Sequence, residues 1–408
     1  MKRIQIKSSN RSSLSFKRAW QAGFTLIEML ASLAVLALIM VILTQTFSTV
    51  SATWRNTTNQ ANSFASARAG FEALKLNLSQ ATLNTYLGYA NSSGTTVPLL
   101  NPSYAAGGPL RNLVPTQYLR ASELHFITGQ ASTIFQQASI DISPSTPSGQ
   151  AVFFQAPAGF VNAPIDRPLG TMLNVMGYYI SFGPSTNFTP DANTIAVPPR
   201  YRYRLMEVIQ PGELNRIYGS TSPPGTTANP VPTYAYNLTW LGALGLPNNT
   251  VEHPLAENII TMALLPKLPP SETVQSAANP KPSALLSTNY TYDSRAWAIP
   301  SGDARWRNQL PPLMELVMVT IDEASALRLA TMYGGANGAN PPFSDSSQLP
   351  GNFDLASVFL QYNNQGPTPP SDLDNDIAKV EAGLTAMKIN YRIFRTDLAL
   401  NNSQWTTN

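Results

Sequence analysis

The chain has 408 residues, of which 43% are hydrophobic and 12% charged, with 34 prolines and no cysteine. This composition allows one large domain or two medium ones, and excludes disulfides, thiolate metal sites, cysteine nucleophiles and lipid attachment at an N-terminal cysteine. The net charge of +3 comes from residues 1–23, because removing their six basic residues from the total of 26 leaves 20 basic against 23 acidic residues. Nucleic-acid binding depends largely on neutralising phosphates, so this mildly acidic remainder argues against nucleic acid as a partner.

The first predicted element is residues 24–43, a run that is apolar except for Thr25, Glu28 and Ser32. At about 1.5 Å per residue, a helix of this length spans roughly 30 Å, the thickness of a bilayer core. All basic residues of segment 1–23 precede it. The positive-inside rule therefore predicts a cytoplasmic leader at 1–23, a membrane-spanning helix at 24–43, and a body in the periplasm or at the cell surface.

A secretory signal peptide or a plain membrane anchor also begins with a basic segment and an apolar run. The apolar region of a signal peptide usually has about 7–15 residues and is followed by a small-x-small cleavage site. Here the run is longer, and the only candidate for such a site is the weak Val50-Ser51-Ala52. These features alone leave the plain anchor open.

Glu28 distinguishes this run from an ordinary anchor. A carboxylate costs roughly 2.5–3.5 kcal/mol near the centre of a spanning helix, and less near its end, so Glu28 needs a partner. If the chain is cut between Gly23 and Phe24, the new amine of Phe24 on a neighbouring subunit can neutralise Glu28. Gly23 has no side chain, which suits a protease pocket that contacts the backbone. The leader, the cut and Glu28 thus form one chemical unit.

The sequence Gly23-Phe24-Thr25-Leu26-Ile27-Glu28 resembles the cleavage and methylation motif of type IV pilins and type II secretion pseudopilins. The resemblance implies cleavage after Gly23 and N-methylation of Phe24 by a prepilin peptidase/N-methyltransferase. It also implies a single-pass inner-membrane protein that assembles through Glu28 with other pilin or pseudopilin subunits.

The helical pattern continues beyond the membrane. An apolar stripe with spacings of 3, 4, 3 and 4 predicts that the helix extends to about residue 84, with 44–87 as its extracytoplasmic part. The stripe consists of Phe64, Ala67, Phe71, Leu74 and Leu78, with Glu72 and Lys75 on the solvated side.

Two stretches carry a finer resemblance. Residues 67–74 (ARAGFEAL) and 78–84 (LSQATLN) resemble the Verru_Chthon cassette proteins of type C and, more loosely, the J-type minor pseudopilins. Trp297 and Trp306, followed by Leu310-Pro311 and an apolar strand, are similar to the C-terminal part of the J-type proteins. An amphipathic helix explains the first stretch equally well, and a loop with two core-covering tryptophans explains the second.

Residues 88–408 are predicted to form a pilin-like α+β body, an antiparallel sheet packed on the N-terminal helix with long loops. Alternating and apolar patterns predict strands at 122–128, 151–156, 174–182, 200–208, 258–265, 313–321 and 389–398, and helices at 322–332 and 374–387. Segments rich in Pro, Gly, Ser and Asn predict loops at 88–117, 134–150, 183–199, 219–233, 267–311 and 334–371. Strict alternation over 200–205 predicts a solvated face on that strand.

The sequence offers little catalytic chemistry. His125, expected in a strand, and His253, expected in a loop, lack metal-ligand spacing and a local nucleophile, so surface or packed imidazoles explain them. The interleaved Arg and Tyr of 200–204 suit stacking on single-stranded nucleic acid, but ordinary cross-strand pairing explains them too.

The acids Asp372, Asp374 and Asp376 resemble the start of a Ca²⁺ loop. However, Ile377 stands where such a loop needs glycine, and Gly383 where it needs glutamate. Acids that favour the start of a helix explain this cluster as well.

These features predict a minor pilin or pseudopilin, assembled into a short type II secretion or type IV pilus-like filament without cofactor or catalytic activity. An alternative is an adhesin or substrate-binding module that uses the pilin signal for display, with loops 267–311 and 334–371 as its contact surface. A tethered enzyme is a third class, which the scarcity of histidine and the lack of a catalytic motif disfavour.

Overall fold

The computed structural model describes residues 25–90, 116–162, 170–185, 199–215, 217, 238–242, 251–268, 274–276, 279–283, 286–287, 290–296, 304–335, 339–360 and 372–405. The chain divides into two compact units, Met1–Thr57 and Thr58–Asn408. The predicted leader 1–23 and loop 219–233 lie outside the described residues, as does Trp297.

Helix α1 (Leu26–Ser79) runs without interruption for 54 residues. Within the second unit it carries the predicted stripe, whose buried members are Ala67, Phe71, Leu74 and Leu78. Glu72 and Lys75 lie on the solvated side and form an ion pair of 3.5 Å. The helix ends at Ser79 rather than near residue 84, because Thr82 already bridges to Gln155 of the sheet.

Among the described residues, the larger sheet has six antiparallel strands in the order β11-β3-β4-β5-β6-β7. Its strands are β3 (Ile127–Gln130), β4 (Thr146–Ala156), β5 (Asn174–Pro184), β6 (Tyr201–Gln210), β7 (Val251–Glu257) and β11 (Tyr292–Asp293). Every residue of β5 is buried, so this central strand is covered on both faces.

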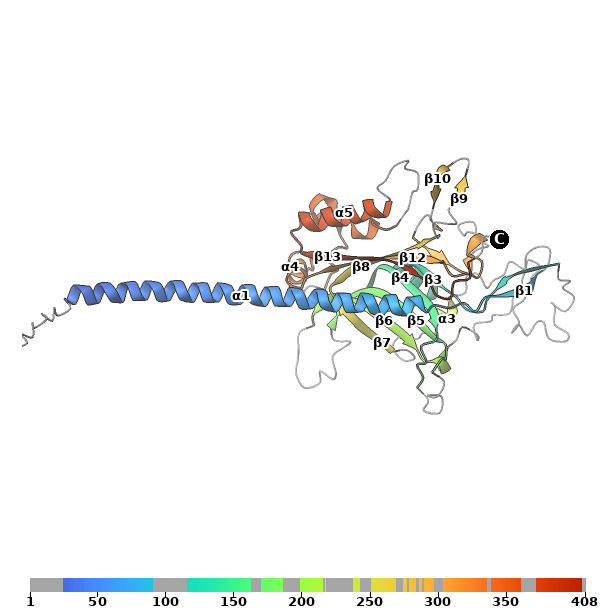
Figure 1. The fold of residues 1–408 in the computed structure, drawn as a ribbon, viewed down its shortest axis with the longest axis horizontal. Coiled ribbons are helices and arrows are strands. Elements are labelled where there is room, and N and C mark those ends of the chain that lie inside the picture. Colours follow the sequence, from blue (N-terminus) through green and yellow to red (C-terminus); the bar gives the residue numbers. More distant parts are fainter. Residues whose placement is uncertain are drawn as a thin grey trace, which may run out of the picture. The chain divides into compact units, whose positions relative to one another are not determined.

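A second sheet in the described part has three antiparallel strands in the order β13-β12-β8. They are β8 (Ile259–Lys267), β12 (Leu313–Ile321) and β13 (Tyr391–Ala399). Phe394 of β13 contacts Phe71 of α1, with ring centroids 5.6 Å apart, while the adjacent Arg395 pairs with Asp374 of α5 (Asp372–Ala386) at 2.6 Å. Because neighbouring strand residues point to opposite faces, α1 and α5 cover opposite faces of this sheet (Figure 1).

β4 joins the two sheets. The hydroxyl of Ser148 donates to the carbonyl of Ile260 at 3.2 Å, and Oε1 of Gln150 accepts from the backbone N–H of Leu264 at 2.6 Å. The core between the sheets is therefore continuous, and it includes large aromatic side chains such as Phe153 and Tyr179.

The remaining elements are short. They are the strand pairs β1 (Tyr86–Ala90) with β2 (Gln117–Ala121) and β9 (Val274–Ser276) with β10 (Asn279–Ser283); helices α2 (Ala131–Ala138), α3 (Thr239–Gly242) and α4 (Glu323–Tyr333); and 3₁₀ turns η5 (Gly212–Leu214), η9 (Ala304–Trp306), η11 (Ser346–Gln348), η12 (Pro350–Asn352) and η13 (Leu355–Ser357).

Several loop predictions are wrong in part. Helix α2 and the start of β4 occupy much of 134–150, and β9, β10, β11 and η9 lie within 267–311. His253, predicted to lie in a loop, lies in strand β7. Trp306 is buried and donates from Nε1 to the carbonyl of Leu286 at 3.0 Å, so it covers the core.

The predicted solvated face of strand 200–208 is also wrong. Arg202, Tyr203 and Arg204 on β6 are all buried. Their alternation reflects two covered faces, one of which holds guanidinium groups in internal ion pairs. The fold class itself is confirmed: a long N-terminal helix is followed by antiparallel sheets in an α+β architecture, consistent with a pilin-like fold.

Candidate functional site

The first turn of α1 is closed by Thr25 and Glu28. Oε2 of Glu28 accepts hydrogen bonds from the backbone N–H and from the hydroxyl of Thr25, both at 2.9 Å. The backbone N–H of Glu28 lies 3.4 Å from Thr25 Oγ1 and 3.1 Å from its carbonyl oxygen. These reciprocal bonds form a capping box, T-x-x-E, which satisfies N–H groups that a helix start leaves open. The sequence interpretation missed this local role, although the spacing is visible.

The segment that follows is apolar and exposed. All residues from 25 to 50 are exposed, including large side chains such as Leu26 and Leu33. By length and composition, α1 is able to cross a membrane. An apolar surface of this extent requires lipid or protein around it. The single described helix that passes this test starts at the capping box.

The two residues of the predicted cut, Gly23 and Phe24, lie outside the described residues. Of the three predicted site residues Gly23, Phe24 and Glu28, the structure therefore describes the surroundings of Glu28. It lies at the start of the apolar segment, and its Oε2 is held by Thr25. Its contact with an amine of another subunit stays a prediction.

The C-terminal half of α1 is joined to the six-stranded sheet by polar contacts. Asn77 donates from Nδ2 to the hydroxyl of Tyr178 at 2.6 Å and to Oε1 of Glu207 at 3.1 Å. Tyr178 also donates to Oε1 of Glu207. Burial raises the pKa of Tyr178 above its ordinary value, and the adjacent Glu207 carboxylate raises it further. The hydroxyl therefore stays protonated and keeps donating.

His125 is buried completely, so it is a packed imidazole. Its Nε2 lies 2.6 Å from Oδ1 of Asp293, and its Nδ1 accepts from Nε1 of Trp240 at 3.0 Å. Burial lowers the pKa of His125, and the Asp293 carboxylate opposes that shift only in part. With one nitrogen donating and the other accepting, the neutral imidazole satisfies both partners. Asp293 and Trp240 are 168 and 115 residues away from His125, so sequence patterns do not indicate these contacts.

His253 is half exposed on β7, and its Nε2 lies 2.9 Å from Oε2 of Glu207. It thus extends the row formed by Tyr178 and Glu207 across three neighbouring strands. The two histidines of the chain are not brought together, and within the described residues no group of three His, Asp or Glu side chains is arranged to hold a metal ion.

Two members of the acidic cluster are engaged in contacts within the described structure. Asp374 pairs with Arg395, whereas the buried Asp376 accepts from the hydroxyl of Tyr290 at 3.0 Å and pairs with Lys379 at 2.9 Å. The side chain of Asp372 lies outside the described residues. Asp374 and Asp376 therefore fix the start of α5 to its surroundings, which agrees with the helix-start explanation.

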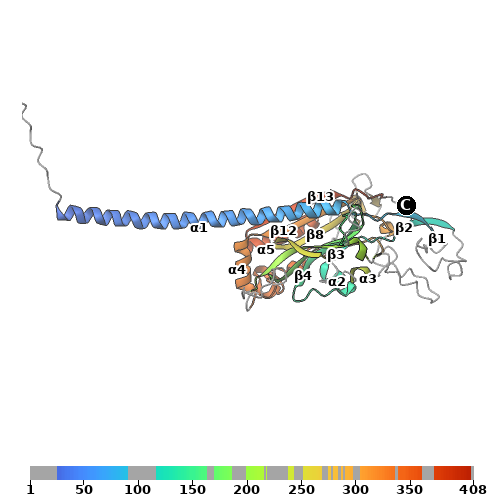
Figure 2. The same cartoon turned by 90° about the horizontal axis from the view of Figure 1, so that it is seen from below.

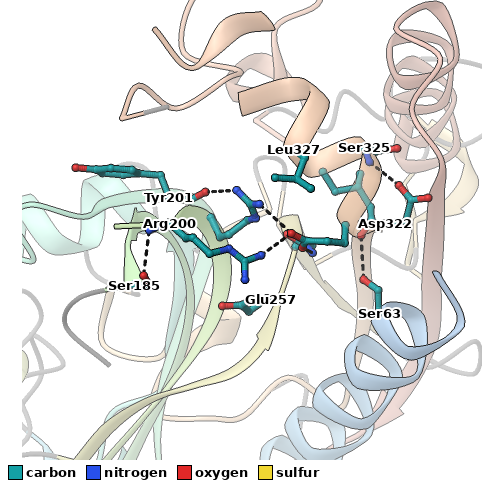
Figure 3. A network of polar contacts seen from close by, with 12 residues as sticks. Ser63, Ser185, Arg200, Tyr201, Glu257, Asp322, Ser325 and Leu327 are labelled. Carbon is teal, nitrogen blue, oxygen red and sulfur yellow. Dashed lines mark hydrogen bonds and ion pairs between the residues drawn. The ribbon is translucent and has the colours of Figure 1, made fainter. Parts of the chain in front are cut away.

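The interleaved arginines of β6 are held in a network with α4 (Figure 3). Oε1 of Glu323 accepts from Arg200 at 2.5 Å and from the buried Arg202 at 2.9 Å, and its Oε2 accepts from Asn258 at 2.9 Å. Arg204 pairs with Glu257 at 3.2 Å. The guanidinium groups of Arg202 and Arg204 are thus engaged within the molecule, as the explanation by internal pairing expects.

A cavity of about 450 Å³ lies between β4, the start of α2 and residues 341–360. Its walls include Thr146, Ser148, Phe343, Leu355 and Val358, and none of its lining residues carries a charge. The sequence indicated the 334–371 segment as a contact surface but gave no sign of a cavity.

One family model, described as a prokaryotic N-terminal methylation motif, matches residues 21–44. No curated protein and no solved structure matches the chain. The match covers the predicted cut, the capping box and the apolar start of α1. The match supports a processed subunit of the pilin type, a structural component that is anchored by one helix. It also implies a prepilin peptidase and pilin-type partners.

Proposed function

We propose that the chain is a minor pilin or pseudopilin subunit that is cut after Gly23, methylated on Phe24 and assembled into a short membrane-anchored filament. The observation that carries this proposal is the methylation motif at 21–44, located at the start of an uninterrupted helix that continues into the folded body. The leader would stay in the cytoplasm and the body would lie in the periplasm or at the cell surface.

Glu28 has two roles in this proposal. Through Oε2 it closes the first turn of its own helix. In the assembly its charge would pair with the methylated amine of Phe24 on a neighbouring subunit, which offsets the cost of a carboxylate in the membrane. The type II secretion machine and the type IV pilus both fit this role, and the resemblance of 67–84 to Verru_Chthon cassette and J-type proteins favours a minor component.

The mass and N-terminal sequence of the mature protein, extracted from membranes, test the proposal. We expect a terminus at Phe24 that carries one additional methyl group. An uncut chain, or one cut near Ala52, would contradict the proposal and leave a plain anchor or a secreted protein.

The cavity favours a second function, an adhesin or substrate receptor displayed by a pilin anchor. Its volume of about 450 Å³ lies within the range of ligand sites in proteins, and its uncharged lining suits a neutral ligand. Ala356→Trp would fill the cavity, and Ala378→Trp on the exposed surface of α5 is the matched control. Loss of adhesion or cargo binding in Ala356→Trp alone, with filaments intact, would support the receptor function; unchanged binding would exclude this cavity as its site.

A further inference from the structure

The outer strands of the two larger sheets differ in how their edges are closed. β11 has only two residues, and β7 contains Pro254 and a shift in its register with β6. The outer edge of β8 is covered by the side chains of Ser148 and Gln150 from β4. Short length, proline, irregular register and side-chain cover are the devices by which proteins prevent an edge from pairing with another chain.

β13 has none of these devices. It contains no proline, and its nine residues pair with β12 without a register shift. Within the part of the chain that the structure describes, β12 is the one strand that pairs with β13. Most side chains of β13 are exposed or half-buried. Since every second residue of an edge strand directs its N–H and C=O outward, β13 presents a regular row of backbone donors and acceptors.

Charged side chains are the other common protection of an edge, but two of the three on β13, Arg395 and Asp397, are paired within the molecule. Arg395 pairs with Glu315 and with Asp374. Asp397 pairs with Lys267 at 3.0 Å. Burial lowers the pKa of Lys267, but its bonds to Glu315 and Asp397 outweigh that effect and raise the pKa. These charges stay neutralised and do not repel an approaching strand.

The direction of β13 limits what can pair with it. Arg392 lies over the ring of Phe64, Phe394 contacts Phe71, and the N–H of Asn401 donates to the carbonyl of Ser79. The residue numbers of the contacting pairs thus increase together along both elements, so β13 runs in the same direction as α1. Figure 2 shows β13 beside α1. Antiparallel pairing of β13 with β13 of a second copy would reverse one α1. Subunits that share one direction in the proposed filament do not pair in that way.

We propose that the open edge of β13 binds an extended strand of a different subunit in the same membrane-anchored assembly. This inference rests on the proposed pilin-type function, because the subunits of such a filament lie side by side and share one direction. The main-chain groups of β13 supply the hydrogen bonds. Side chains of the added strand extend the two faces of the sheet, which α1 and α5 cover.

Hydrogen exchange tests the proposal in the full chain, in native membranes and after purification in detergent. We expect every second amide of 391–399 to exchange fast in the purified protein and slowly in the assembly. The amides of the central strand β12 should be protected in both states. Equal protection of β13 in both states, whether fast or slow throughout, would overturn the proposal.

Cross-linking identifies the occupant. Because the chain contains no cysteine, Thr396→Cys gives one attachment point for a photoreactive label on β13. Thr385→Cys, on the exposed surface of α5, is the matched control. We expect Thr396→Cys to cross-link to an extended segment of another pilin-type subunit. Cross-links to a second copy of this chain, or equal yields from both variants, would contradict the proposal.

The mature N-terminus separates this proposal from the proposed function. A chain methylated on Phe24 whose β13 amides stay unprotected would refute the edge contact alone. An uncut chain whose β13 amides become protected would refute the pilin-type function while retaining the added strand.

Discussion

Asn77 on α1 donates a hydrogen bond of 3.1 Å to Oε1 of Glu207 on β6. The same carboxylate oxygen also accepts from Tyr178 on β5, so one buried group joins the helix to two central strands. The apolar stripe explains why the helix packs on the sheet, but apolar contacts tolerate sliding. Directed polar contacts fix the position of the helix along the sheet, because a shift would remove Asn77 as a donor to the buried Tyr178–Glu207 pair.

Asn77→Ala should therefore lower the free energy of unfolding by about 1–3 kcal/mol, the usual cost of removing one partner of a buried polar group. Asn375→Ala on the exposed surface of α5 is the control and should change it by less than about 0.5 kcal/mol. Denaturant unfolding of the full chain in detergent measures both. Equal effects would show that the stripe alone positions the helix.

His125 should make stability depend on pH. Its pKa in the folded chain is lowered by burial, so below the unfolded value of about 6.5 the unfolded chain binds a proton that the folded chain does not. Stability is complete above that value and falls as pH decreases, by up to about 1.4 kcal/mol per pH unit. We expect a smaller decrease from pH 7.5 to 5.5 in His125→Gln than in wild type. Identical slopes would contradict the assignment of a neutral His125.

The elements that the sequence predicted well are those whose signal is local. β12 was predicted at 313–321, where it is found, and the helix at 322–332 lies within one residue of α4. α2 was missed although its buried residues Ala131, Ile134, Phe135 and Ala138 follow helical spacing, because Ser and Gln between them read as loop.

The burial of β6 was not predictable in the same way. Arg202 depends on Glu323, which is 121 residues away, and Arg204 on Glu257, which is 53 residues away. Alternating Arg and Tyr have the pattern of a half-solvated strand, and only the tertiary fold brings the carboxylates to them. In the candidate site, the motif and Glu28 are local features, whereas the cavity and the open edge of β13 arise from distant segments.

Glu323→Gln tests the network in Figure 3. Burial raises the pKa of Glu323, but hydrogen bonds from Arg202 and Asn258 outweigh that effect and lower the pKa. The ion pairs therefore stabilise the fold above about pH 4.5 and are lost as pH falls further. Loss of the charge leaves the guanidinium of Arg202 buried without its carboxylate, so we expect a decrease of about 3 kcal/mol at pH 7. The exposed Glu381→Gln is the control; an equally small change in both would show that Arg202 does not need its partner.

Two substitutions separate the two roles of Glu28. Glu28→Gln keeps a side-chain oxygen for the capping box, because Gln also serves at this position, but it removes the charge. Glu28→Val removes both. Cleavage after Gly23 should continue in both variants, since the cut precedes Leu26, where α1 begins, and the N-terminal mass verifies this. If pairing with the Phe24 amine drives assembly, both variants should co-purify with far fewer partner subunits than wild type. If the cap alone matters, Glu28→Gln should assemble as wild type does while Glu28→Val fails, and the proposed amine contact would then be wrong.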